Sequence, residues 1–227
     1  ALPILLIGFS DVTALHYFVN ENLDWKSIHG STAATGKIIN ASTNIKPNLS
    51  ASSQNQSSEN SNNISPQDAL ALNAQQDGID EIFNVIHHGV QYKGLLPLNP
   101  EAHKNPITGK LSGGNLTLIQ TLFSTRYEKS WNNKILLLED VGVTYKQLDR
   151  LLHQLLFKTN FHPKAIVFGQ FYPTKTNDGE RLIYKDVIRS YASQTQIPVY
   201  YYPYFGHGKI NKPFILGENA NISCDKD

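Results

Sequence analysis

Residues 4–19 read ILLIGFSDVTALHYFV and combine three local patterns within one short stretch. The apolar run at 4–7, closed by Gly8, is typical of a fully buried strand of an α/β sheet. After a turn at 9–11, apolar residues recur at helical spacing over 12–19. This order predicts a strand, a tight turn and a helix, which together form the local unit of an α/β fold.

The second half of the chain repeats this alternation. The patterns predict helices over 115–123, 145–157 and 180–194, and strands over 134–139, 165–171 and 198–202. Between them and the first unit, the Gly- and Pro-rich passage 92–114 predicts connecting loops. The alternation of strands and helices indicates an α/β architecture along most of the chain.

A polar segment divides the chain. Residues 40–65 consist mainly of Asn, Ser, Gln and Thr, and so few apolar side chains cannot offset the ordering entropy, which predicts a disordered linker. A helix is expected to start near Pro66, because proline is favoured at the first helical position. We therefore divide the chain into a first unit at 1–39, the linker at 40–65, a connecting helix at 66–91 and a C-terminal domain at 92–227.

Composition excludes several classes of protein. The 227 residues carry 20 basic and 19 acidic side chains, so a net charge of +1 provides no field to hold nucleic acid or an anionic bilayer. No apolar run approaches the roughly 20 residues that a membrane span needs, so we expect a soluble protein. The single cysteine, Cys224, rules out an internal disulfide and a cysteine-based zinc site.

The first candidate for chemistry is Ser10. A serine on the sharp turn between a buried strand and a helix has its oxygen exposed, and the amides of the helix start face a developing oxyanion. The alternative is that Ser10 or Asp11 only caps the helix, as Ser and Asp commonly do. The usual nucleophile elbow also has a second glycine where this sequence has Val12.

Two further candidates lie in the second half of the chain. Glu139 and Asp140 follow an apolar strand, at the edge where α/β folds place their sites, although from these residues alone a strand end followed by a turn at Asp140 is the better explanation. His207 lies between two glycines, which leave an imidazole accessible, although a loop histidine is more often simply exposed. The order serine, acid, histidine is nevertheless the one that α/β hydrolases use for a catalytic triad.

These blocks together resemble the LD-carboxypeptidase family, which includes the microcin-immunity hydrolases. The resemblance covers most of the chain outside residues 31–65. The matching blocks are the nucleophile block Ile7–Leu15, the segment His29-Gly30, the glycine block Gly109–Leu116, the acid block Lys134–Val141, the helix Gln147–Leu155 and the histidine block Pro203–Gly208 with Leu216-Gly217.

The resemblance implies a serine peptidase. In it, Ser10 attacks, His207 acts as general base and Glu139 orients His207, while the amide of Asp11 donates to the oxyanion and Gly113 and Gly114 belong to the substrate-binding block. The implied reaction cleaves the L,D peptide bond that releases terminal D-alanine from muropeptide tetrapeptides during cell-wall recycling. Neither a metal nor an organic cofactor is implied.

Other expectations follow from the family. Relatives have a flavodoxin-like domain before the nucleophile block, so residues 1–39 are expected to be its end, and a cleaved N-terminal piece is a candidate partner. A homodimer in the cytoplasm is expected, with the periplasm as the alternative compartment. The fold implied is the end of a flavodoxin-like domain joined to an α/β C-terminal domain of the LD-carboxypeptidase type.

Three alternative functions stay open. The same triad could hydrolyse peptidyl-nucleotide antibiotics, but only Trp25 and Trp131 are available as tryptophan clamps for a base, and core packing explains either. The chain could also be an inactive muropeptide-binding relative. A secreted glycoprotein is the third alternative, because Asn-x-Ser/Thr occurs at Asn40, Asn48, Asn55, Asn63, Asn115 and Asn221.

Overall fold

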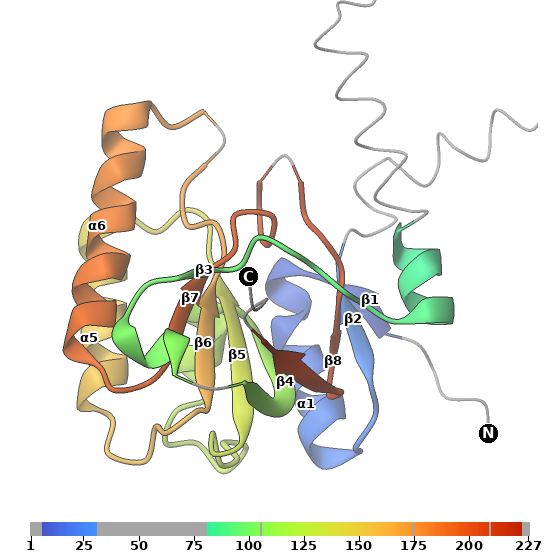
Figure 1. Ribbon diagram of the computed structural model, residues 1–227. Helices are drawn as coiled ribbons and strands as arrows, with labels where there is room; N and C mark the ends of the chain where they lie inside the picture. Colours follow the sequence, from blue (N-terminus) through green and yellow to red (C-terminus); the bar gives the residue numbers. More distant parts are fainter. Residues whose placement is uncertain (1–5, 31–80, 105, 174, 209, 224–227) are drawn as a thin grey trace, which may run out of the picture.

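The computed structural model describes residues 6–30, 81–104, 106–173, 175–208 and 210–223. Its strands form a six-stranded sheet in the order β3-β7-β6-β5-β4-β9 and a three-stranded sheet in the order β1-β2-β8. Figure 1 shows the larger sheet beside α5 and α6, and the smaller sheet beside α1. The mixed α/β fold expected from the sequence is confirmed.

The centre of the larger sheet is parallel. It consists of β4 (Ile107–Asn115), β5 (Lys134–Glu139), β6 (Ala165–Phe168) and β7 (Val199–Tyr201), each paired in parallel with the next. The edges are antiparallel, with β3 (Leu96–Pro97) on β7 and β9 (Asn219–Ile222) on β4. Parallel strands end at the same edge of a sheet, so the end of β5 at Glu139 lies on the edge where α/β proteins place their sites.

Both faces of the larger sheet are buried. On one face, Leu136 and Leu138 pack against α5 (Tyr145–Phe157) and α6 (Asp178–Gln194), whereas Ile135 and Leu137 belong to the core on the other face. This alternation is the period of two that a strand imposes. It explains why β5 reads as an uninterrupted apolar run rather than an alternating one.

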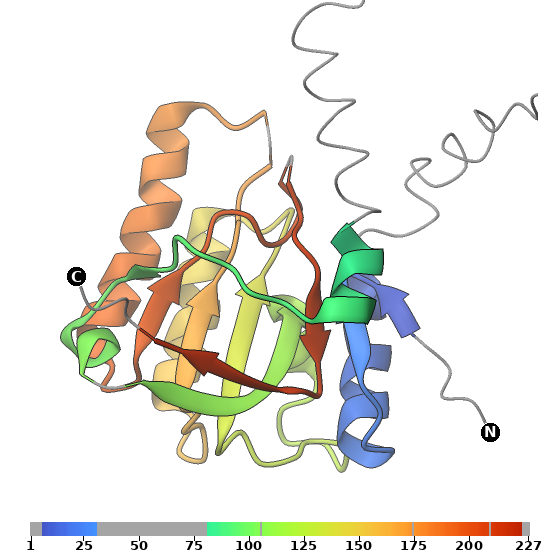
Figure 2. The same cartoon turned by 45° about the vertical axis from the view of Figure 1, so that its right-hand side comes forward.

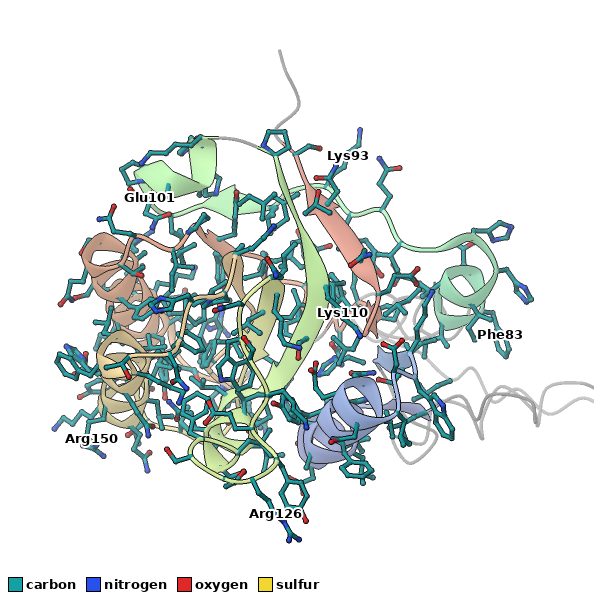
Figure 3. All side chains as sticks on the ribbon, turned by 90° about the horizontal axis from the view of Figure 1, so that it is seen from below. Phe83, Lys93, Glu101, Lys110, Arg126 and Arg150 are labelled. Carbon is teal, nitrogen blue, oxygen red and sulfur yellow. The ribbon has the colours of Figure 1, made fainter. Side chains whose placement is uncertain are left out.

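The smaller sheet carries the first predicted unit. In it β1 (Leu6–Gly8) pairs in parallel with β2 (Ser27–His29), and α1 (Thr13–Asn22) connects them. The third strand, β8 (Phe214–Leu216), comes from the far end of the chain and pairs antiparallel with β2. Seen from below, β4 lies between α1 and the pair of helices α5 and α6 (Figure 3).

A tight turn at Gly217 connects the two sheets. Gly217 has a φ of +82°, and its backbone N–H donates to the carbonyl of Leu111 on β4. Any side chain there would lie 3.0 Å from both the Asn20 amide nitrogen and the Trp25 carbonyl. Figure 2 shows the C-terminal segment, in dark red, passing from β8 to β9.

The prediction of connecting loops throughout 92–114 was wrong. The structure has β3, a short helix η3 (Pro100–His103) and then β4, the nine-residue strand that carries most of the glycine block. The glycines are there because neighbouring backbone approaches closely: a Cβ on Gly109 would lie 2.8 Å from the Asn133 carbonyl oxygen. Glycine within a strand indicates such an approach as readily as a loop.

The other predicted elements are present with shifted ends. The strand expected at 165–171 ends at Phe168, and the helix expected at 115–123 is α4 (Leu116–Thr121), with Asn115 as its cap. Of the connecting helix predicted at 66–91, residues 81–88 are helical, and residues 66–80 lie outside the described residues, as does the linker predicted at 40–65. Among the helices that the structure describes, none is long and apolar enough to cross a membrane.

Candidate active site

Ser10 lies on a strained turn. Its φ is +60°, a left-handed conformation that a residue with a side chain rarely adopts. The turn follows β1 directly and continues through the short helix η1 (Ser10–Val12) into α1. A Cβ on Gly8 would lie 2.9 Å from the Val12 side chain, so the tight turn requires glycine there. This strained strand-to-helix turn is the geometry that exposes a nucleophilic serine in α/β hydrolases.

Glu139 and His207 form a hydrogen-bonded pair. The Oε2 atom of Glu139, the last residue of β5, lies 2.6 Å from Nδ1 of His207. The Glu139 side chain is 0% exposed and that of His207 is 17% exposed. A carboxylate bonded to Nδ1 fixes the tautomer that has Nε2 free to accept a proton.

The environment of the pair changes both pKa values. Burial raises the pKa of Glu139, and the hydrogen bond from His207 acts against this rise. Burial alone would lower the pKa of His207, but the hydrogen bond to Glu139 and its charge prevail and raise this pKa above its ordinary value. A carboxylate that favours the protonated imidazole stabilises the charge that a general base acquires during catalysis.

Glycines hold the His207 loop against the sheet. Gly206 has a φ of +105°, and a Cβ there would lie 2.8 Å from the Glu139 Cβ. The Gly206 amide donates to Asn211 Oδ1 at 3.0 Å, and the Gln170 amide donates to the Phe205 carbonyl at 2.9 Å. The loop is therefore fixed from both sides, and only glycine allows its approach to Glu139.

The serine turn lies next to the His207 loop. The ring of Phe9, which precedes Ser10, has its centroid 4.9 Å from that of His207. The charge of Asp11 is close enough to contribute to the raised pKa of His207. Within the described residues, no hydrogen bond joins Ser10 Oγ to His207. The catalytic roles of Ser10, Glu139 and His207, and the oxyanion role of Asp11, therefore stay predictions.

Asp140, the other acid at this strand end, has a different environment. Its carboxylate accepts hydrogen bonds from the Asn115 side chain, the Thr117 amide and hydroxyl, and the Val141 amide, at 2.7–3.0 Å. These contacts attach the end of β5 to the first turn of α4. Asn115 is 7% exposed and caps α4, which leaves it unavailable as a glycan acceptor.

Gly113 and Gly114 are buried in β4. A Cβ on Gly113 would lie 2.0 Å from the Leu137 carbonyl oxygen, and one on Gly114 would lie 2.4 Å from the Thr13 hydroxyl. The Thr13 hydroxyl also accepts a hydrogen bond from the backbone N–H of Asn115 at 2.9 Å, which attaches the start of α1 to β4. The two glycines thus place the serine turn against the larger sheet, and their role in substrate binding stays a prediction.

Two buried histidines, His16 and His29, have no role in the site predicted from the sequence. His16 Nε2 contacts the Gly8 carbonyl at 2.9 Å and His16 Nδ1 contacts Ser27 Oγ at 2.8 Å, which fixes the strand end before the turn. His29, at the end of β2, is 0% exposed and packs near Phe9 and Phe205. The His29-Gly30 block of the resemblance was the available signal.

The remaining candidates are mostly explained by packing. Trp131 is 0% exposed and packs on Tyr17, whereas Trp25 is 40% exposed. Tyr200 and Tyr202 are buried in the core, and Tyr204 is 42% exposed. In the part of the chain that the structure describes, no three His, Cys, Asp or Glu side chains group as ligands for a metal ion.

The second half of the chain matches a known family of protein domains. Residues 108–222 match the LD-carboxypeptidase C-terminal domain. The chain is 35% identical over 97% of its length to a protein of Rickettsia conorii that carries a provisional carboxypeptidase name, and it spans 59% of that protein. It is 29% identical over its whole length to the murein tetrapeptide carboxypeptidase of Pseudomonas aeruginosa, of which it spans 65%.

Solved structures share the fold. The muramoyltetrapeptide carboxypeptidase of Oxalobacter formigenes aligns with 97% of this chain and 66% of its own, at a TM-score of 0.59 and 21% identity. An MccF-like protein of Bacillus anthracis aligns with 98% of this chain and 65% of its own, at a TM-score of 0.61 and 20% identity.

Proposed function

The chain belongs to the LD-carboxypeptidase family, and from this premise we propose that the whole protein is a serine carboxypeptidase that releases terminal D-alanine from muropeptide tetrapeptides. The observation that carries the proposal is the hydrogen bond between Glu139 Oε2 and His207 Nδ1 beside the strained Ser10 turn. Because this chain spans 59% of the Rickettsia relative, the activity is proposed for the protein that includes its upstream region.

The proposed reaction follows acyl-transfer chemistry. Ser10 Oγ attacks the carbonyl carbon of the L,D peptide bond while His207 Nε2 accepts the hydroxyl proton, and Glu139 stabilises the imidazolium. The amide of Asp11, at the start of the helix, donates to the oxyanion. His207 then protonates the leaving amine of D-alanine, and water releases the acyl group from Ser10 by the same steps.

The name of the Pseudomonas relative supports the substrate class. Peptidyl-nucleotide hydrolysis ranks second: Trp131 is fully buried and cannot stack on a base, which leaves Trp25, 40% exposed, as the one tryptophan in the described residues that could. We also propose, by family analogy, a homodimer in the cytoplasm and division of the chain at 40–65 between an N-terminal and a C-terminal unit.

The test is D-alanine release from a muropeptide tetrapeptide by the protein with its upstream region. Ser10→Ala should lose about 10⁶-fold in kcat, whereas Ser193→Ala, on the exposed surface of α6, should match the unchanged protein. If the Ser10→Ala variant still releases D-alanine, Ser10 is not the nucleophile. If the unchanged protein releases no D-alanine but cleaves a peptidyl nucleotide, the second function replaces the first.

A further inference from the structure

His29 is a polar residue in an unusual environment. Its side chain is 0% exposed at the end of β2, and among the described residues neither ring nitrogen has a hydrogen-bond partner. Burial, with the nearby His16 and His207, lowers the pKa of His29 to about 3. The imidazole is therefore neutral at physiological pH, and it is unusual because most buried polar groups in proteins have a hydrogen-bond partner.

Aromatic contacts surround the ring of His29. Its centroid lies 4.6 Å from that of Phe205, 6.3 Å from that of Phe9 in an edge arrangement, and 6.2 Å from that of His16. These separations lie in the range that favours aromatic pairing. The ring of His29 is thus held by packing of its faces and edges and not by hydrogen bonds from its nitrogens to described residues.

The partners of His29 connect it to both halves of the site. Phe9 immediately precedes Ser10 and contacts the ring of His207. Phe205 is 0% exposed and is followed by Gly206 and His207, in the loop that contacts Glu139. His29 therefore packs both against Phe9, beside the proposed nucleophile, and against Phe205, in the loop that carries the proposed base.

We propose that His29 is a positioning residue for the reaction above, in which the flat ring acts as a spacer that sets the separation of the Ser10 turn from the His207 loop. This inference rests on the proposed function of Ser10 and His207. It assigns the role to ring shape and not to the nitrogens, since neither nitrogen pairs with a described group. Phenylalanine should therefore replace His29, and a flexible polar side chain should not.

Two variants separate shape from polarity. His29→Phe keeps a flat ring and removes both nitrogens, whereas His29→Gln keeps polar atoms and removes the ring. Each is made in the protein that includes its upstream region, and circular dichroism and a thermal melt check that it is folded. A histidine with only a packing role would change the melting temperature in both variants and leave the reactivity of the folded molecules unchanged.

The first readout is the rate at which a fluorophosphonate labels Ser10, because this probe needs an activated serine and no particular substrate. We expect His29→Phe to label within about threefold of the unchanged protein and His29→Gln to label about 10²-fold more slowly, the order of loss for a misplacement of about 1 Å. Equal rates in all three proteins, or a slower rate in His29→Phe than in His29→Gln, would overturn the proposal.

The second readout is the NMR titration of His207. The pKa of His207 is raised because its ring is held on Glu139. We expect this pKa to stay raised in His29→Phe and to fall towards the ordinary histidine value in His29→Gln. If the unchanged protein is not labelled at all, the proposed serine function fails, while the titration still decides on His29: a raised pKa in both variants would overturn the spacer role.

Discussion

Glu139 Oε2 and His207 Nδ1 lie 2.6 Å apart although the two residues are 68 positions apart in the sequence. One is the buried end of β5, and the other belongs to a loop that follows β7. The hydrogen bond therefore forms only when the larger sheet and the His207 loop are correctly assembled. It is also the contact whose removal has the clearest chemical consequence.

Glu139→Gln should reduce kcat by about 10⁴-fold, the size of effect seen when the triad acid of a serine protease is replaced by its amide. The amide removes the negative charge that raises the pKa of His207, so the acid limb of the kcat/KM profile should move to lower pH. Steady-state kinetics across pH measures both effects. The control is Glu101→Gln in η3, and an unchanged profile in Glu139→Gln would contradict the orienting role.

Gly206→Ala should reduce kcat about 10²-fold with the protein still folded. Its new Cβ would lie 2.8 Å from the Glu139 Cβ, so the loop must move and His207 moves with it. Gly94→Ala is a matched control, because Gly94 also has a positive φ, +87°, but has nothing within 4 Å of the added atom. Comparable kinetic losses in both variants would point to backbone strain instead of displacement.

Asp140→Ala should destabilise the fold without contacting the reacting atoms. It leaves the buried Asn115 amide and the Thr117 and Val141 groups without their acceptor, and we expect the free energy of unfolding to fall by about 3 kcal/mol. Urea denaturation measures this value. The exposed Asp149→Ala on α5 should change it by less than about 0.5 kcal/mol. An equally small decrease in the free energy of unfolding of Asp140→Ala would show that the hydrogen bonds of Asp140 contribute little to stability.

His29 should make the fold sensitive to acid. The pKa of His29 is about 3 in the folded protein and about 6.5 in the unfolded chain. Below pH 6.5 the unfolded chain therefore binds more protons than the folded protein, and the free energy of unfolding decreases as the pH is lowered. From pH 6.5 to pH 5 this effect amounts to about 1.6 kcal/mol. Chemical denaturation at both pH values should show that the free energy of unfolding decreases by this amount less in His29→Phe than in the unchanged protein. Equal decreases in the two proteins would mean that His29 becomes protonated in the folded protein.

The sequence predicts those parts of the fold whose local patterns agree with their surroundings. The run at 134–139 is buried on both faces, as an uninterrupted apolar strand requires. The run before Gly8 forms a strand as expected, but Leu6 and Ile7 are only half-buried. The helix α5 starts where Thr144 and Gln147 cap each other. In contrast, β4 contains glycines that look like a loop, because the reason for them lies in the backbone of β5, which the sequence of β4 does not show.

The candidate site is predictable to a similar extent. A serine after a strand and a histidine between glycines are visible as types of residue, and the family resemblance assigned Glu139 rather than Asp140. The structure gives the physical difference: Asp140 is fully occupied at the start of α4, and Glu139 contacts His207. The packing of His29 against both Phe9 and Phe205 depends on long-range contacts, so local pattern does not reveal it.

The turn at Gly217 affects the order in which the molecule can be assembled during translation. Ribosomes deliver the amino-terminal part of a chain first, yet the second neighbour of β2, after β1, is β8. The side-chain amide of Asn20 also donates to the carbonyl of Leu216, 196 positions further along the sequence. Contacts between such distant positions form late, because a long stretch of chain must close first. The sheet behind Ser10 is thus completed only after the Glu139 and His207 segments have been synthesised, because β8 follows both of them in the chain.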